Sequence, residues 1–153
     1  MDLNFDKAVS LIKNCKGRVG VMGLGKSGLI GRKISATMSS VGIPSAFLHS
    51  ADGLHGDIDM LIKNDIVIML SYSGGTEEIK KVLLVLRKMK AKVIVMTDKI
   101  KAKVWQSNKC VISCSIKKET WPVQSCAYFI YYRNACCNGQ CFSSTYRFKF
   151  KRF

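Results

Sequence analysis

The sequence lacks any apolar run of the about 20 residues that a membrane-spanning helix requires, so we expect no membrane partner. Residues 1–6 carry neither the basic segment nor the apolar segment of a secretory signal peptide. We therefore expect a cytoplasmic protein whose seven cysteines are reduced thiols and not a disulfide framework. A length of 153 residues suits a single domain with a sizeable core.

Acidic residues are missing from the C-terminal part of the chain. All ten Asp and Glu residues lie at or before Glu119, against 25 Lys and Arg residues in the whole sequence. No nucleic-acid-binding motif accompanies this basic charge, so we interpret it as a lysine-rich solvated surface and expect no nucleic-acid partner. The cysteines of this part lack a C-x-x-C pair, which argues against a zinc site there. They are Cys126, Cys136, Cys137 and Cys141.

Apolar periodicity along the rest of the chain predicts strands and helices in alternation. The expected strands are 18–23, 45–48, 66–70, 92–97 and 109–113. The expected helices are 5–16, 27–41, 76–90 and 99–107, and 51–61 is expected to be a loop with a short helix. Short connections and alternation of this kind favour an α/β fold with three layers, in which helices flank a mainly parallel five-stranded sheet of the flavodoxin or Rossmann type.

Two loops rich in glycine and hydroxyl groups follow strands and open helices. They span residues 23–28 and 71–76, and parallel strands would place both at the carboxyl-terminal edge of the sheet. A helix N-terminus presents unpaired N–H groups to an anion, and glycine lets the backbone approach it closely. Either loop alone could be an ordinary strand-to-helix turn. Two at one edge favour a phosphate site.

A nucleotide P-loop is the first alternative, because residues 20–27 fit the pattern G-x-x-x-x-G-K-[ST]. Such a site needs an acid at the end of an apolar strand to position Mg²⁺. Ser71 occupies that place, Asp65 precedes its strand, and Gly20 is expected inside a strand. A dinucleotide fingerprint also fails, since residues 45–49 end without an acid.

The residues at 23–33, 49–57, 71–74 and 96–97 together resemble the sugar isomerase (SIS) domain, and more narrowly the arabinose-5-phosphate isomerase family. The resemblance covers about residues 16–119 and implies an SIS-type fold. It also implies interconversion of ribulose 5-phosphate and arabinose 5-phosphate through an enediol, with a phosphorylated sugar as ligand. An intact member would be expected to form a homo-oligomer.

The resemblance also implies site residues. The catalytic positions that match are Lys26, His55, Glu78 and Glu119. The substrate-binding positions that we assign are Gly25, Ser27, Ser71, Ser73, Thr76 and His49. His49 matches a proposed metal position, but two histidines are too few ligands, so we expect no cofactor, with a divalent metal at His49 as the alternative. Simpler interpretations stay open. In these, Glu78 is only a first-turn acid that suits the helix dipole, and His49 and His55 are ordinary loop histidines. Gly75 replaces an acid usual in the family.

The resemblance stops after Glu119. Removing one G from the codon of Trp121 lets degenerate codons for residues 121–136 encode, in register, the family's Cys-Pro-x-x-Leu-Ala-Pro-Thr-Ser-Ser stretch. We therefore interpret 1–120 as a partial SIS domain and 121–153 as a non-homologous, out-of-frame and poorly ordered basic tail. A genuine tail is the rival reading. Without the family's later catalytic histidine segment and CBS domains, we expect little or no isomerase activity. A non-catalytic sugar-phosphate sensor is the alternative function.

Overall fold

A computed structural model describes residues 3–51, 56–108 and 110–114. The α-helices are α1 (Leu3–Lys13), α2 (Lys26–Ser40) and α3 (Glu77–Lys88). The strands are β1 (Val19–Gly23), β2 (Ser45–His49), β3 (Ile66–Leu70), β4 (Lys92–Thr97) and β5 (Cys110–Ser113). Two short 3-10 helices are η2 (Asp57–Met60) and η3 (Lys103–Trp105). The tail expected at 121–153 lies outside the described residues.

The five strands form one parallel sheet in the order β2-β1-β3-β4-β5. This confirms the predicted fold class and the predicted five strands. Every residue of the central strand β3 is buried, as its unbroken apolar sequence Ile-Val-Ile-Met-Leu predicts for a strand covered on both faces. The chain moves outward from β1 to β2 and then returns to the other side of β1 for β3. The order therefore reverses between β1 and β3.

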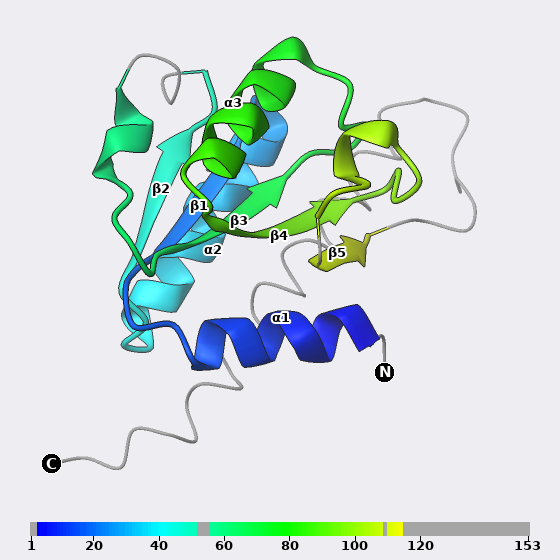
Figure 1. Ribbon diagram of the computed structural model, residues 1–153. Coiled ribbons are helices and arrows are strands. Elements are labelled where there is room, and N and C mark those ends of the chain that lie inside the picture. The colour runs from blue at the N-terminus through cyan, green and yellow to red at the C-terminus, as the bar shows by residue number, and fades with distance from the viewer. Residues whose placement is uncertain (1–2, 52–55, 109, 115–153) are drawn as a thin grey trace, which may run out of the picture.

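Helices cover both faces of the sheet, and Figure 1 shows α2 and α3 on opposite sides of it. On one face α1 and α2 bury apolar side chains against the strands; these include Ala8, Ile12, Ile34 and Met38. On the other face α3 and η3 form a second core with Ile79, Val82, Leu83, Leu86 and Trp105. In the described part of the chain, no helix combines the length and the apolar character needed to cross a bilayer.

The helix expected over 99–107 is wrong. The structure has only the three-residue η3 there, because the Trp105 side chain is drawn into the second core and is 1% exposed. Ile100, which a continuous amphipathic helix would bury, is 47% exposed. Burial of one large aromatic side chain therefore outweighs the moderate helix preference of the surrounding lysine-rich segment.

Asp65 has a structural role at the amino-terminal edge of the sheet, far from the loops that follow the strands. Its Oδ1 accepts a hydrogen bond from the backbone N–H of Arg18 (2.7 Å), and its Oδ2 accepts one from the N–H of Ile62 (3.0 Å). The Arg18 guanidinium lies 3.7 Å from Oδ2. This carboxylate therefore joins the start of β1 to the start of β3.

Glu77 begins α3, and its Oε1 lies 2.6 Å from Lys80 Nζ. The hydrogen bond and the charge of Lys80 hold the pKa of the Glu77 carboxyl below its ordinary value. We expect an NMR titration to place this pKa below that of an unpaired glutamate, and Lys80→Ala to raise it. The pair would favour folding above the ordinary glutamate pKa and lose that effect as the pH falls through the lowered one. Lys81→Ala is the control, with a smaller shift, since Lys81 contributes least.

Candidate functional site

The first of the two predicted loops is short. Only Leu24 and Gly25 separate β1 from α2, and Gly25 has φ +54°, a backbone conformation that glycine adopts freely. Gly23 ends β1, where a Cβ would lie 2.8 Å from the backbone of Ser27, so α2 begins against the strand. Gly20 lies within β1, as predicted. A two-residue connection cannot wrap a triphosphate, which removes the nucleotide P-loop alternative.

The second loop joins β3 to α3 through residues 71–76. Ser71 Oγ accepts a hydrogen bond from the backbone N–H of Gly74, and Ser73 Oγ accepts one from that of Gly75, both at 3.1 Å. Each hydroxyl keeps its own hydrogen, which it can donate elsewhere. Gly74 has φ +66°. The loop is thus closed by its own side chains, with hydroxyl donors available to a ligand.

The two loops meet in one cavity of about 600 Å³. The register of the sheet explains this, because Gly23 at the end of β1 pairs with Leu70 at the end of β3. The described residues that line the cavity are Leu24, Lys26, Ser27, Leu70, Ser71, Tyr72, Ser73, Thr76 and Ile79. The cavity therefore occupies the point where the strand order reverses, which is where open parallel sheets bind their ligands.

Five predicted site residues lie together in this cavity: Lys26, Ser27, Ser71, Ser73 and Thr76. Thr76 lies directly before the first residue of α3. It is the residue at the N-cap position, but its side chain makes no capping hydrogen bond and the residue lines the cavity instead. The first N–H groups of α3 consequently have no side-chain cap and can serve an anion.

Three further predicted site residues that the structure describes are not among those that line the cavity. Gly25 directly precedes Lys26 at the start of α2. His49 ends β2, on the far side of β1 from β3, with its ring centroid 6.4 Å from that of Phe47. Glu78 is half-buried in the first turn of α3. His55 and Glu119 lie outside the described residues. The roles of all these residues stay predictions.

Within the described residues, no group of three or more His, Cys, Asp and Glu side chains could hold a metal ion. His49 therefore has no described ligand set around it, and a metal there stays an untested alternative.

Sequence reasoning did not assign site roles to four residues that line the cavity, namely Leu24, Leu70, Tyr72 and Ile79. Tyr72 could have been found, because it lies between two predicted serines.

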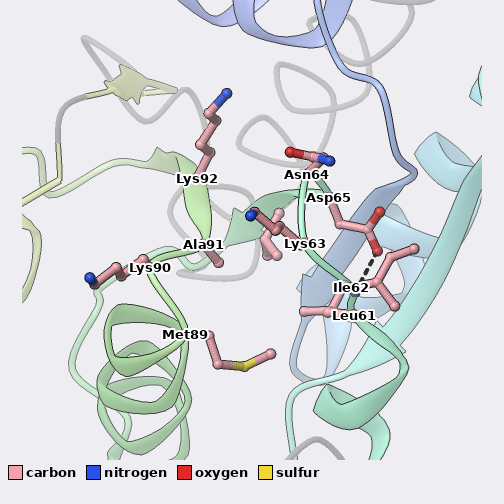
Figure 2. Close-up of a pocket in the computed structure, with 10 residues that line it drawn as sticks. Leu61, Ile62, Lys63, Asn64, Asp65, Met89, Lys90, Ala91 and Lys92 are labelled. Carbon is pink, nitrogen blue, oxygen red and sulfur yellow. Dashed lines mark hydrogen bonds between the residues drawn. The ribbon is translucent and has the colours of Figure 1, made fainter.

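A second cavity, of about 460 Å³, lies at the opposite edge of the sheet beside the starts of β3 and β4. Its walls include Leu61 and Met89, and its basic side chains do not converge. Figure 2 shows Lys63 extending across it, while Lys90 and Lys92 point away in different directions. The cavity between β1 and β3 is thus the better candidate site.

Comparison with known proteins identifies the family of this chain. The SIS domain family matches residues 11–132. The arabinose 5-phosphate isomerase GutQ of Salmonella typhimurium is 38% identical over 120 residues, which are 78% of this chain and 37% of that protein. The arabinose 5-phosphate isomerase KpsF of Escherichia coli O6:H1 is 39% identical over 118 residues, 77% of this chain and 36% of that protein. The chain thus spans little more than a third of the curated relatives that it matches.

Solved structures with a similar fold also match the chain. The E. coli CFT073 protein c3406, in complex with arabinose 5-phosphate, aligns with a TM-score of 0.83 and 32% identity over 95% of this chain and 79% of that one. Vibrio vulnificus NanR, complexed with ManNAc-6P, aligns with a TM-score of 0.77 over 94% of this chain and 53% of that one. At 15% identity this second likeness shows the fold alone. The domain boundary expected near Thr120 stays a prediction. Fold, motifs and relatives together show that the chain belongs to the SIS domain family.

Proposed function

We propose that the cavity between β1 and β3 binds a phosphorylated pentose, with arabinose 5-phosphate as the first ligand to test. One observation carries the proposal: two loops at the ends of adjacent strands bring serine hydroxyls, an uncapped helix N-terminus and Lys26 into a single cavity. The sugar-phosphate complex of c3406 supports the choice of ligand. A volume of about 600 Å³ is ample for a pentose phosphate.

The phosphate would lie against the loop at residues 71–76. Ser71 and Ser73 would each donate a hydroxyl hydrogen to it while still accepting a backbone N–H. The first N–H groups of α3 would supply further donors, and the helix dipole would favour the negative charge. Glu77 begins the same helix, but Lys80 pairs with its carboxylate and reduces its repulsion of the ligand.

Lys26 would lie beside the sugar end of the ligand, since it approaches the cavity from the other loop. A bound aldose could be isomerised if a base removed the proton from carbon 2 and an acid returned one to carbon 1, while the proton of the carbon 2 hydroxyl moved to the oxygen of carbon 1. The enediolate formed between these steps carries negative charge on oxygen, which an ammonium group stabilises. The resemblance implies Glu78, His55 and Glu119 for the proton transfers. Isomerisation is the second candidate function, favoured by Lys26. Sugar-phosphate binding is the function that we propose for this chain.

Calorimetric titration of the full chain with arabinose 5-phosphate tests the proposal. We expect Ser73→Ala and Lys26→Met each to weaken binding about tenfold, because each removes a hydrogen bond or charge contact to a charged ligand. Lys33→Met is the matched control, since Lys33 is an exposed lysine two turns further along α2 and outside the cavity. Its affinity should equal that of the unchanged protein.

Absence of binding at millimolar ligand, or full affinity in Lys26→Met, would rule out the proposed site. NMR of the same samples would follow the conversion of arabinose 5-phosphate to the ketose. Turnover that Lys26→Met abolishes and Lys33→Met preserves would establish isomerisation in place of simple binding.

A further inference from the structure

Trp105 packs directly against the backbone of Gly74, the glycine at the centre of the second loop. A Cβ placed on Gly74 would lie only 2.6 Å from the indole atoms Cε2 and Cζ2 and 2.8 Å from Nε1. The two residues come from different parts of the chain, one from the β3–α3 loop and one from η3 after β4. The indole therefore needs a residue without a side chain opposite it.

The position of Trp105 is itself fixed by its surroundings. Its side chain belongs to the core under α3, together with Ile79 and Val82. The 3-10 turn that carries it is closed by the N–H of Trp105 donating to the carbonyl of Ala102 (3.0 Å). Arg87 from α3 donates to the carbonyl of Val104 at 2.7 Å. The indole is therefore held in place by the core and by η3, and the backbone of Gly74 packs against it.

The loop is also tied to the end of β4 at Tyr72. The carbonyl of Tyr72 accepts hydrogen bonds from Thr97 Oγ1 (3.0 Å) and from the N–H of Asp98 (3.3 Å). These bonds fix the loop between the two serines, whereas Trp105 fixes it after them. Gly74 is the donor to Ser71 Oγ, so a shift of Gly74 would disturb a serine that lines the cavity.

We infer that Trp105 is a positioning residue for phosphate binding, which holds Gly74 and the serine hydroxyls of residues 71–76 in the arrangement that a phosphate requires. The inference rests on the proposed function. A loop that is ordered before the ligand arrives avoids the entropic cost of ordering on binding, so its support raises affinity without touching the ligand. Trp105 is absent from the cavity lining, which fits this indirect role.

Trp105 also offers a spectroscopic readout. Its Nε1 is buried without a hydrogen-bond partner among the described residues and lies next to Gly74. A small movement of the loop would therefore change the polarity around the indole. The chain has two tryptophans, so Trp121→Phe leaves Trp105 as the only one. We expect arabinose 5-phosphate and inorganic phosphate each to change the fluorescence of this variant, with a midpoint equal to the calorimetric Kd.

Affinities of Trp105 variants complete the test. Trp105→Leu should weaken binding of both arabinose 5-phosphate and inorganic phosphate about tenfold, while Trp105→Phe, which keeps a flat ring, should stay within about threefold of the unchanged protein. Leu86→Ala is the matched control, because Leu86 is fully buried in the same core but belongs to the last turns of α3. It should lower stability and leave both affinities unchanged.

The outcomes distinguish the positioning role of Trp105 from the proposed binding function. Full affinity for both ligands in folded Trp105→Leu would overturn the positioning role while leaving the proposed function in place. An equal loss of affinity in Leu86→Ala would also overturn it, because the effect would then follow stability alone. No binding by the unchanged protein would overturn both.

Discussion

Gly74→Ala is expected to lower the free energy of unfolding by about 3 kcal/mol, the sum of two separate costs. A backbone φ of +66° is unfavourable for a residue with a Cβ, by about 1–2 kcal/mol. The new methyl would also lie 2.6 Å from two carbons of Trp105, an overpacked contact that costs about 1–3 kcal/mol. Urea denaturation followed by circular dichroism measures the difference.

The neighbouring glycine provides the control for this prediction. A Cβ on Gly75 would find its nearest neighbour, Ser73 Oγ, at 3.4 Å, which is ordinary contact. Gly75→Ala should therefore change stability by no more than about 0.5 kcal/mol. Combining Gly74→Ala with Trp105→Leu should cost less than the sum of the two single changes, because the leucine relieves the overpacking. If the stability losses of the two single variants are fully additive in the double variant, residues 74 and 105 do not clash in Gly74→Ala.

Asp65→Ala is expected to destabilise the protein by about 3 kcal/mol, because it removes the acceptor of two backbone N–H groups and the partner of a guanidinium. The carboxylate side chain is 2% exposed, so water cannot readily replace it. Asp59→Ala, on the exposed surface of η2, is the control and should be within about 0.5 kcal/mol of the unchanged protein.

The position of Asp65 also leads to a prediction about ligand affinity. Asp65 lies at the amino-terminal edge of the sheet, so the affinity of folded Asp65→Ala for arabinose 5-phosphate should be unchanged. Thermal unfolding with and without ligand measures both quantities in one experiment. A stable Asp65→Ala variant would mean that the three interactions at the start of β1 and β3 contribute little.

The sheet and the two loops that follow β1 and β3 were predictable because their signals are local. Residues 66–70 are apolar without a break, which predicts a strand covered on both faces, and the structure buries all five. The loop at residues 71–76 combines glycine and hydroxyl residues before an amphipathic helix. Parallel strand order then places it beside Lys26 and Ser27, since equivalent ends of adjacent strands share an edge.

Other features of the structure depend on contacts between distant residues, which the spacing of apolar residues in the sequence does not reveal. Trp105 and Gly74 are far apart in the chain, and neither shows a pattern that would pair them. Burial of the same tryptophan is why the helix expected over 99–107 is reduced to η3. His49 is predicted at the site because it matches a family position. The sheet pairs it with Gly23, where the first loop begins, and its role stays a prediction.

The strand order also determines which strands stay paired when the protein unfolds locally. β1 and β3, which carry the cavity, each have a hydrogen-bonded strand on both sides, whereas β2 and β5 form the two edges of the sheet in the described part of the chain. Native proteins open in local units, and the elements with fewest neighbours open at the lowest cost. Fraying of an edge strand therefore leaves the strands that carry the cavity intact. Amide hydrogens of β1 and β3 should exchange last, so that loss of the site coincides with global unfolding.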